Sequence, residues 1–447
     1  MNYQEAIDYL NSFTDYEKNT EYVYQDIKLE RVKSLLNKLD NPHKKFRSVQ
    51  IAGTKGKGST CAFIFSILKE AGYKVGLYTS PHLIDFKERI KISYEDDMAE
   101  IRERLIDQNE VSELVEEIKP HADGIKGLTF FEVYTVLAFL FFARKKIEFA
   151  VLETGLGGRL DATNVVNSLV CAFSGISMDH MAILGNTIEK ISREKAGIIK
   201  DNSLVVTVAQ PPQAWREIER ICKEKNIRYY QVGKDFIYDV IGQNLEGSIL
   251  DFKGIADSYQ NLHINLVGPF QALNAALALS VIQLLRQHEI IISSLAVKRG
   301  LQNAHWPGRM HIVHRNPFFV FDGAQNPASA HALRAAINVL FIPKKAILIF
   351  GVSKDKDVRG MIPHLVRGQN LIILTQANHP RAMDVDTLEQ KMVQFKRIIK
   401  KTKTVGEALN LAIENISSKN DLVVVAGSLY LIGEAYTALK DLKFPEY

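Results

Sequence analysis

A glycine-rich segment between a predicted strand and a predicted helix constrains this chain more than any other feature. It reads IAGTKGKGST over residues 51–60, after an apolar run that begins at Phe46 and before a helical pattern that ends near Ala71. Glycines at 53, 56 and 58 let backbone N–H groups turn inward around an anion, and the helix N-terminus adds its positive end. The segment therefore predicts a phosphate-binding loop in an α/β fold.

The polar residues of this segment suit a nucleotide. Lys57 can neutralise the β- and γ-phosphates, and Ser59 or Thr60 can face a magnesium ion. The segment is not a standard Walker A motif, which needs four residues between its first glycine and Gly-Lys, whereas two residues separate Gly53 from Gly56. A glycine-rich turn without a ligand is the alternative. The combination of strand, glycines, lysine, hydroxyls and helix favours a phosphate.

Apolar runs alternate with helical patterns along the whole chain, which predicts α/β layers. Helices are expected near residues 4–12, 28–39, 98–118, 130–146 and 270–287. Buried strands are expected at 74–78, 149–153, 169–174 and 204–208, and residues 228–266 are expected to form short strands of a small edge sheet. After the polar segment 298–303, strands are expected at 310–313, 318–321, 346–350, 370–374 and 422–426. This spacing is typical of parallel sheets with right-handed crossovers.

The length of 447 residues exceeds what one hydrophobic core usually organises. We expect a P-loop-type parallel-sheet ATPase domain over residues 1–304. Residues 305–447 are expected to form a smaller, Rossmann-like α/β domain. An ATP-using enzyme with two such domains would place its reaction in the cleft between them.

Composition argues against several other classes of protein. Net charge is +5, and Lys and Arg are interspersed with Asp and Glu, which does not favour a nucleic-acid binder. Cys61, Cys171 and Cys222 lie too far apart for a disulfide framework or a thiolate metal site. The most apolar stretch, 128–143, contains Glu132 and is shorter than the roughly 20 residues of a membrane span. The N-terminus lacks the features of a signal peptide. We expect a cytoplasmic protein without a membrane partner.

Three candidate metal ligands follow predicted strands. They are Ser80, Glu153 and His180. Because the carboxyl ends of parallel strands line one crevice, the three side chains are expected to converge on Mg²⁺. Each alone is ordinary, because Ser-Pro is usually a turn and a lone histidine is usually structural. Lys195 lies in a helix expected to begin near Thr187, and its spacing alone does not distinguish it from a surface lysine.

Taken together, these residues resemble the folylpolyglutamate synthase and dihydrofolate synthase family, a branch of the Mur ligase superfamily. The resemblance covers nearly the whole chain, and its strings are long and in the family's order. They are AGTKGKGST at 52–60, TSPHLIDFKERIKI at 79–92, LTFFEVYTVLAF at 128–139, ETGLGGRLDATNVV at 153–166, DHMAILGNTIEKISREKAGIIK at 179–200, GPFQALNAALAL at 268–279, WPGRM at 306–310, DGAQNP at 322–327 and GSLYLIGE at 427–434.

The resemblance implies a role for each matching position. The catalytic residues would be Lys57, Glu153, His180 and Lys195. Ser80, Glu153 and His180 would bind Mg²⁺, and Lys195 resembles the family's carbamoylated lysine, which becomes an anion beside a second Mg²⁺. The residues implied in ATP binding are Thr54, Lys55, Gly56, Lys57, Gly58, Ser59, Thr60, Asn274, Arg309 and Asp322. The residues implied on the pterin or folate side are Leu29, Glu30, Thr129, Phe130, Phe131, Glu132, Leu160, Asp161 and Ala162. Gln325 and Ser428 are implied in glutamate binding.

Three positions depart from the family pattern. Gln325 stands where the family often has histidine near the glutamate pocket, and glutamine cannot take a positive charge. Lys55 replaces a common asparagine in the loop and adds attraction for phosphate. Lys28 stands where some pterin-binding members have glycine.

The resulting hypothesis is an ATP-dependent ligase that adds L-glutamate to a folate-type carboxylate through an acyl phosphate, acting as a monomer on small molecules. One alternative is a Mur-type ligase with a UDP-muramoyl acceptor, which would want a sugar-nucleotide domain before the first strand, where only about 45 residues stand. A remoter alternative is a nucleotide-binding switch protein, but the Asn-Lys-x-Asp string at 37–40 precedes the phosphate loop, the wrong order for guanine recognition. The choice between dihydropteroate and reduced folates stays open.

Overall fold

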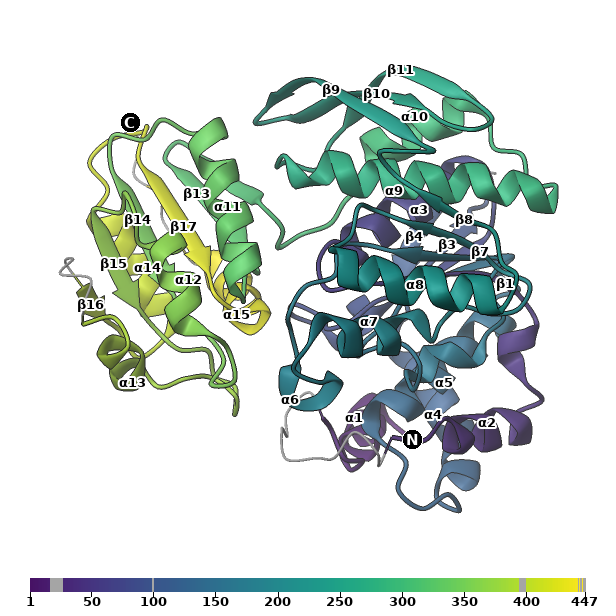
Figure 1. Ribbon diagram of the computed structural model, residues 1–447. Coiled ribbons are helices and arrows are strands. Elements are labelled where there is room, and N and C mark those ends of the chain that lie inside the picture. The colour runs from purple at the N-terminus through teal and green to yellow at the C-terminus, as the bar shows by residue number, and fades with distance from the viewer. Residues whose placement is uncertain (17–26, 99, 394–398, 441, 443, 445–447) are drawn as a thin grey trace.

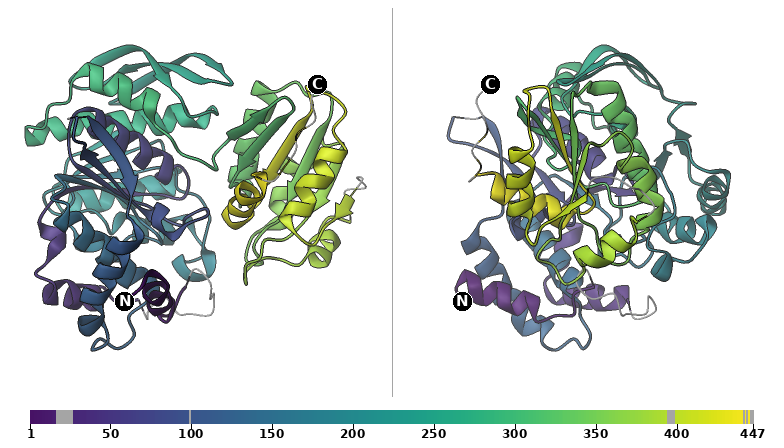
Figure 2. Two further views of the ribbon diagram at one scale, coloured as in Figure 1. Left: turned by 180° about the vertical axis from the view of Figure 1, so that it is seen from behind. Right: turned by 90° about the vertical axis from the view of Figure 1, so that its left-hand side faces the viewer.

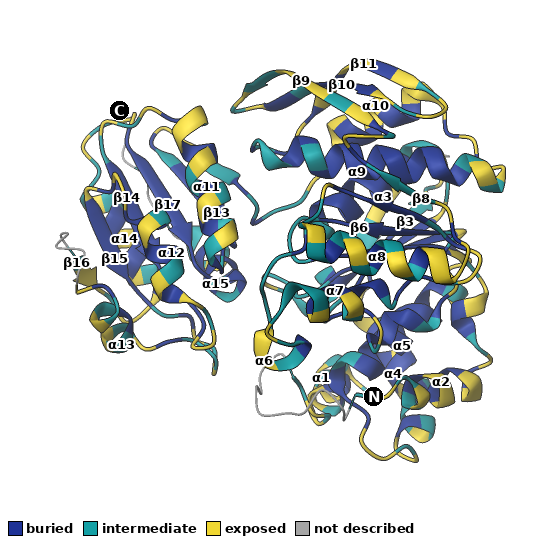
Figure 3. Ribbon diagram, in the orientation of Figure 1, coloured by how far each residue is buried: buried dark blue, intermediate teal, exposed yellow. Residues whose placement is uncertain are grey.

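The computed structural model of the protein describes residues 1–447 except 17–26, 99, 394–398, 441, 443 and 445–447. Two α/β units lie side by side, and the N-terminus and C-terminus belong to different units (Figures 1 and 2). The chain passes from one unit to the other after residue 303, where the last helix of the first unit ends. The central strands of both main sheets are buried, whereas outer helices, loops and some edge strands carry exposed residues (Figure 3).

The first unit is built on an eight-stranded sheet of order β4-β3-β2-β5-β1-β6-β7-β8. Its strands are β1 (Arg47–Ala52), β2 (Val75–Tyr78), β3 (Ile90–Glu95), β4 (Ile101–Leu105), β5 (Phe149–Glu153), β6 (Val170–Phe173), β7 (Leu204–Thr207) and β8 (Tyr229–Gln231). Strands β2, β5, β1, β6, β7 and β8 pair in parallel, and β3 and β4 are antiparallel to their neighbours. Because β2, β5, β1 and β6 are adjacent, the loops after them meet at one edge.

Helices cover both faces of this sheet. They are α1 (Tyr3–Asn11), α2 (Leu29–Lys38), α3 (Lys57–Glu70), α4 (Gln108–Ala122), α5 (Phe130–Arg144), α6 (Met181–Leu184), α7 (Ile188–Ala196), α8 (Pro212–Glu224), α9 (Phe270–Leu285) and α10 (Ser294–Asn303), with 3-10 turns at Pro42–Lys44 (η2), Phe86–Arg89 (η3), Ala162–Val165 (η4) and Arg286–His288 (η5). Side chains alternate along β1, so Val49 and Ile51 join the core under α3, α9 and α10, whereas Ala52 joins the core under α7 and α8.

A separate three-stranded antiparallel sheet lies beyond α9 and α10. Its strands are β9 (Ile237–Asn244), β10 (Gly247–Lys253) and β11 (Ser258–Ile264), in the order β11-β10-β9. The prediction of short strands over 228–266 is confirmed, but they do not extend the edge of the large sheet. Only β8 does so, and the hairpin strands instead pack on the helix layer through residues such as Leu250 and Leu262.

The second unit has a six-stranded sheet of order β12-β13-β17-β14-β15-β16. Its strands are β12 (His311–Arg315), β13 (Phe318–Asp322), β14 (Ala346–Phe350), β15 (Leu371–Leu374), β16 (Ile399–Lys401) and β17 (Leu422–Ala426). All pairs are parallel except β12 with β13. The helices are α11 (Pro327–Leu340), α12 (Val358–Leu365), α13 (Val385–Gln390), α14 (Val405–Glu414) and α15 (Leu429–Leu439). The expected strands are present, and the fold class is confirmed.

The predicted helix over 98–118 is wrong at its start. Residues 101–105 form β4, which pairs with β3, and the helix begins only after Asp107. The Asp107 carboxylate accepts the Glu110 N–H and the Glu110 side chain accepts the Asp107 N–H, which fixes the helix start. This capping pair was readable in the sequence. Within the described part of the chain, no helix is both long and apolar enough to cross a membrane.

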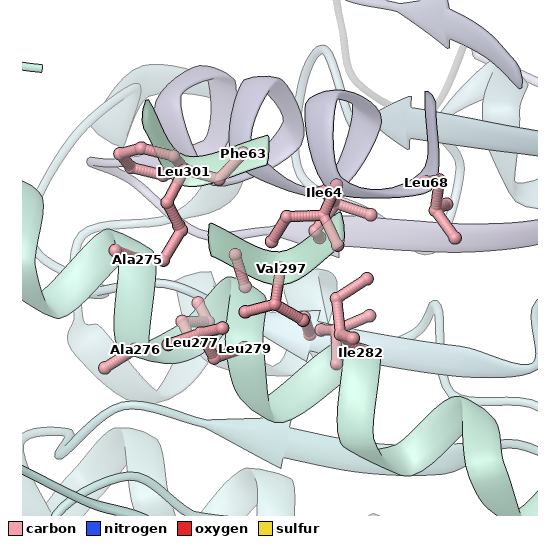
Figure 4. Packing of buried hydrophobic residues seen from close by; sticks show 14 of the residues in the cluster. Phe63, Ile64, Leu68, Ala275, Ala276, Leu277, Leu279, Ile282, Val297 and Leu301 are labelled. Atoms are coloured by element: carbon pink, nitrogen blue, oxygen red, sulfur yellow. The ribbon is translucent and has the colours of Figure 1, made fainter. Parts of the chain in front are cut away.

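Three helices of the first unit meet at short range beside the phosphate loop. Side chains of α3, α9 and α10 point toward one another in Figure 4, among them Ile64, Ile282 and Val297. The backbones of α3 and α10 approach closely at Gly300, where a Cβ atom would lie 2.4 Å from Ile67 Cα of α3. Gly300 has an ordinary helical backbone, so its conformation does not require glycine. The short distance to α3 does, because a side chain would not fit there.

Replacing Gly300 with alanine should destabilise the protein by about 1–3 kcal/mol, since the added methyl group forces α3 and α10 apart. Chemical denaturation of purified protein measures this change. Gly406 in α14 is the matched control, because its Cβ would meet only the Ala438 Cβ, at 3.9 Å. Gly406→Ala should be neutral or slightly stabilising. Equal stability of Gly300→Ala and wild type would contradict the packing described here.

Candidate active site

The phosphate loop connects β1 to α3 and leaves the helix start available to an anion. Gly53 and Gly56 have φ of +146° and +91°, which side chains rarely tolerate, and no side chain caps the helix at Gly56. The Thr60 hydroxyl is buried without a hydrogen-bond partner among the described residues. An uncapped helix start and an unsatisfied hydroxyl at the positive end of a 14-residue helix fit a phosphate.

The loop is tied to the segment that follows β6. The N–H groups of Thr54 and Lys55 donate to the Gly175 carbonyl at 2.9 and 3.2 Å, and the Thr54 hydroxyl bonds to Ser177. These bonds bring the residues at 179 and 180 to the loop. Their position follows from the pairing of β1 with β6 in the sheet.

Glu153 ends β5 and faces the loop lysine. The Lys57 Nζ lies 3.6 Å from Glu153 Oε1, and the N–H of Ser80, which follows β2, donates to the same carboxylate. Burial raises the pKa of Glu153, and the charges of Lys57 and Arg309 partly oppose this. A buried carboxylate of this kind would gain from a nearby cation.

His180 is held in a left-handed backbone conformation with φ of 50°. Burial lowers the pKa of its imidazole to about 4, against the opposing charge of Asp179. The ring is therefore neutral at pH 7, as a metal ligand must be. The ammonium groups of Lys57 and Lys195 lie close enough to lower this pKa further, so His180 shares one site with them.

Lys195 is buried near the end of α7 and points into the loop. Its Nζ donates to the Gly53 carbonyl at 2.8 Å. Burial, together with the ammonium of Lys57, lowers the pKa of Lys195 to about 7. A substantial fraction of this amine is therefore uncharged at neutral pH, unlike an ordinary surface lysine.

Asp179 connects the loop to the second unit, a contact that the sequence analysis did not identify. Lys55 and Lys356 each lie 3.4 Å from its carboxylate, and the Asn326 amide donates to it at 3.2 Å. Burial alone would raise the pKa of Asp179, but Lys55, His180 and Lys356 hold it well below its usual range. Lys356 is only 6% exposed and lies between two aspartates in the sequence, the one signal that could have drawn attention to it.

The predicted nucleotide residues lie around the same loop. A Cβ on Gly56 would lie 2.2 Å from Asn274 Oδ1, so this α9 side chain covers the helix start. Arg309, in the connection between units, is near both Glu153 and Asp322. The Asp322 carboxylate itself accepts the N–H groups of Met310 and Ala324 at 2.7 and 2.8 Å. Asp322 therefore braces the connection, and its contact with a nucleotide stays a prediction.

The predicted pterin-side residues at 129–132 begin α5. Thr129 and Glu132 cap this helix reciprocally, and Glu132 also accepts from Arg31 of α2 at 3.2 Å. Burial raises the pKa of Glu132, although the Arg31 charge opposes this. Phe130 stacks on Tyr134 within the core. Glu132 thus has a structural role here, and a substrate contact is not needed to explain it.

The other pterin-side residues are brought near this helix start. Phe131 covers Gly155, where a Cβ would lie 2.7 Å from the ring. Asp161 accepts the N–H groups of Gly155 and Leu156, which fixes the glycine-rich turn between Leu160 and β5. Helix α2, which begins at Leu29 and Glu30, lies against η4, which begins at Ala162. The segments that carry the predicted pterin-side residues therefore meet around the start of α5, and their contact with a pterin stays a prediction.

Gln325 and Ser428 follow adjacent strands of the second sheet. The Gln325 N–H donates to Ser329, and the Ser428 hydroxyl caps α15 by accepting the Tyr430 N–H. The Tyr430 ring stacks on His379 at 3.7 Å, beside a cavity of about 480 Å³. This cavity is lined by Lys354, Gln376, Ala377, Asn378, His379, Pro380, Ala382 and Asp384. Glutamate binding at Gln325 and Ser428 stays a prediction.

In the part of the chain that the structure describes, no three His, Cys, Asp or Glu side chains group as a ready metal site. The predicted ligand set contains one carboxylate and one imidazole, Glu153 and His180, with the Ser80 and Lys195 side chains completing it. These donors fit a divalent cation only if Lys195 loses its positive charge, since an ammonium beside a cation is unfavourable.

Comparisons with known proteins agree with this architecture. Residues 51–282 match the Mur ligase middle domain, and residues 308–429 match the glutamate ligase domain of Mur ligases. The chain is 35% identical to the dihydrofolate synthase/folylpolyglutamate synthase of Bacillus subtilis, over 96% of this chain and all of that protein. The Escherichia coli FolC structure in complex with DHPP and ADP is 28% identical, covers 99% of this chain and 98% of its own, and has a TM-score of 0.85. A bifunctional folylpolyglutamate synthase/dihydrofolate synthase solved with Mn, AMPPNP and L-glutamate is 28% identical over 98% of each chain, with a TM-score of 0.83.

Asp179→Asn should lower the free energy of unfolding by about 1–3 kcal/mol at pH 7, because the half-buried Lys55 loses its anion and Lys356 keeps only Asp355. The pKa of Asp179 is lower in the folded protein than in the unfolded chain. Its contribution is therefore present above about pH 4 and is lost as the pH falls further. Denaturation of both proteins from pH 3 to pH 8 measures the difference.

Asp96→Asn is the control, because Asp96 pairs with Arg102 at an exposed position and should contribute little. If Asp179→Asn and Asp96→Asn had the same small effect at pH 7, the contact between units would not be stabilising.

Proposed function

The chain belongs to the folylpolyglutamate synthase and dihydrofolate synthase family of Mur ligases, and we propose that it is an ATP-dependent ligase that joins L-glutamate to a folate-type carboxylate. The proposal assigns ATP and the acceptor to a domain of residues 1–304 and the glutamate to a domain of residues 305–447. We further propose that the protein is a monomer and that it acts on small molecules in the cytoplasm. The relatives are named as folate enzymes, which favours this acceptor over a UDP-muramoyl one.

One observation carries the proposal: Lys57, Glu153, His180 and Lys195 share one buried site beside the uncapped start of α3. Buried lysines crowded around one helix start are unfavourable without an anion, and a triphosphate supplies that anion. A switch protein would need phosphate binding alone and would have no use for the buried lysine of α7.

In the first step, an oxygen of the acceptor carboxylate attacks the γ-phosphorus of ATP. The bond between the γ-phosphorus and the bridging oxygen breaks, giving an acyl phosphate and ADP. Lys57, which pairs with Glu153 in the structure, would move to the phosphates and leave the Glu153 carboxylate for a cation. Catalysis here is mainly positioning and charge neutralisation.

In the second step, the amine of glutamate attacks the acyl carbon, and phosphate leaves from the tetrahedral intermediate as the amide forms. Water competes with the amine for the acyl phosphate, so the site must be closed. Contacts of Asp179 with Lys356 and Asn326 support closure by the second unit. Gln325 and Ser428 lie on that unit, at the same sheet edge as Asp322, which supports their assignment to glutamate.

Ser80, Glu153 and His180 would hold a divalent cation, which would neutralise charge on the transferred phosphate. The neutral imidazole and the buried carboxylate support this assignment. The relative solved with Mn and AMPPNP supports a metal–nucleotide pair in the family. Two bound cations are part of the proposal.

Carbamoylated Lys195 would provide the remaining negative charge. The uncharged amine attacks CO₂, its proton leaves, and the product is an anionic carbamate. The pKa of about 7 supports this reaction near neutral pH, because only the uncharged amine reacts. The carbamate would replace a cation that repels metal with an anion that attracts it.

Phosphate release in the presence of ATP, Mg²⁺ and L-glutamate tests the proposed activity. Release is expected with dihydropteroate or tetrahydrofolate and not with a UDP-muramoyl acid, and Lys57→Met should lower kcat/KM at least about a hundredfold. Lys74→Met is the control, because Lys74 is exposed and away from the loop. Turnover with the sugar nucleotide alone would overturn the folate assignment.

Incubation with ¹³C-bicarbonate should give a carbamate NMR signal that is absent from Lys195→Ala. The signal should grow as the pH rises from 6 to 8, because the neutral fraction of Lys195 increases through its pKa of about 7. Lys195→Ala should be nearly inactive and partly rescued by short carboxylic acids. An identical signal in wild type and Lys195→Ala, or full activity in that variant, would remove the carbamate from the mechanism.

A further inference from the structure

The three glycines of the phosphate loop are required for two different reasons. Gly53 and Gly56 have positive φ, so conformation requires glycine there. Gly58 lies in the first turn of α3 with an ordinary helical backbone, where glycine costs about 1 kcal/mol relative to alanine. Residues that follow the lysine in standard phosphate loops carry a hydroxyl for the cation. The absence of any side chain at 58 therefore needs a cause.

The cause is a tryptophan from the connection between the two units. A Cβ on Gly58 would lie 2.6 Å from Cζ2 and 2.9 Å from Nε1 of Trp306. These distances are shorter than side chains tolerate, and a packed indole ring cannot move aside as a flexible side chain would. The edge of the indole therefore occupies the space that the side chain of a standard loop would fill.

The indole N–H lies at that same edge. Within the described ranges of the chain it donates to no acceptor. Trp306 is partly buried and packs on the core of the first unit, so its ring is held against the loop and remains partly accessible. This donor therefore lies against the phosphate loop, at Gly58.

Trp306 also begins the connection that carries Arg309. Met310, four residues after the tryptophan, belongs to the core of the second unit. Arg309 lies between these two anchors and is near Glu153 of the first sheet and Asp322 of the second. The position of the indole on Gly58 therefore fixes one end of a short segment that presents Arg309 to the site.

Resting on the proposed ATP-dependent function, we propose that Trp306 is a positioning residue for the nucleotide. Its indole closes the phosphate loop at Gly58 and links occupation of the loop by ATP to the segment that carries Arg309. Gly58 and Trp306 form one complementary pair, so a change in either alters the fit of the other.

A double-mutant cycle on nucleotide binding tests this pair. Gly58→Ser alone should raise the Kd for Mg-ADP at least about tenfold, because the new side chain meets the indole. Trp306→Ala alone should raise it about tenfold by uncovering the loop, with a matching rise in the KM for ATP and little change in the KM for glutamate. The double variant should bind more tightly than the product of the two changes predicts, because serine then fills the vacated space.

Fluorescence gives a second readout that a purely structural role would not change. The chain has two tryptophans, and the other, Trp215, lies in α8 and meets Tyr229 edge to face. In a Trp215→Phe protein, which should keep full activity, Mg-ADP should change the emission of Trp306.

Independent effects of the two substitutions, or unchanged emission at saturating nucleotide, would overturn the role of Trp306. Equilibrium dialysis of Mg-ADP with the wild-type protein separates the two proposals. Failure of the wild type to bind would defeat the proposed function itself, whereas binding and ligation with an additive cycle would defeat the role of Trp306 alone.

Discussion

The chemistry of this protein depends on a group of buried and half-buried lysines around the start of α3. Lys55, Lys57 and Lys195 of the first unit and Lys356 of the second surround Glu153 and Asp179. Burial lowers the pKa of Lys55 to about 8 and that of Lys195 to about 7. The site therefore carries unfavourable positive charge until a polyanion enters. On the proposed function, a triphosphate would draw Lys57 from Glu153, while the loop and its other lysines already surround the binding position.

This arrangement follows from the order of strands in one sheet. Ile51 of β1 is in register with Glu153 of β5, and β1 also pairs with β6, which leads to Asp179 and His180. The register of this sheet thus places Glu153 and the segment that carries Asp179 and His180, whereas Lys57 and Lys195 are presented by the helices α3 and α7. A shift of β1 by one residue relative to β5 would move the loop away from Glu153. It would also turn the core side chains of β1 to the opposite face of the sheet.

The sequence predicted the features that depend on local patterns of residues. Apolar runs located most strands, and the spacing of glycines and Lys57 predicted the phosphate loop. The start of α4 was misplaced because the apolar pattern continues through β4, and only the Asp107 cap marks the boundary. The contact of Asp179 with Lys356 could not be predicted in this way, because the two residues are 177 positions apart and meet only when two separately folded cores pack together. Gly58 was assigned to the loop's conformation, whereas its space is taken by Trp306.

Contacts between the two units pass through the site itself. Asp179 binds Lys55 on one side and Lys356 and Asn326 on the other, and the charge of Arg309 opposes the rise in pKa that burial causes at both Glu153 and Asp322. The segment after Ser80 also contacts the second unit. A Cβ on Gly433 of α15 would lie 1.8 Å from the carbonyl oxygen of Leu83 in the first unit. Approach of the second unit and completion of the site are therefore one event. A ligase that makes an acyl phosphate needs this coupling, because an activated carbonyl formed before closure would be lost to water.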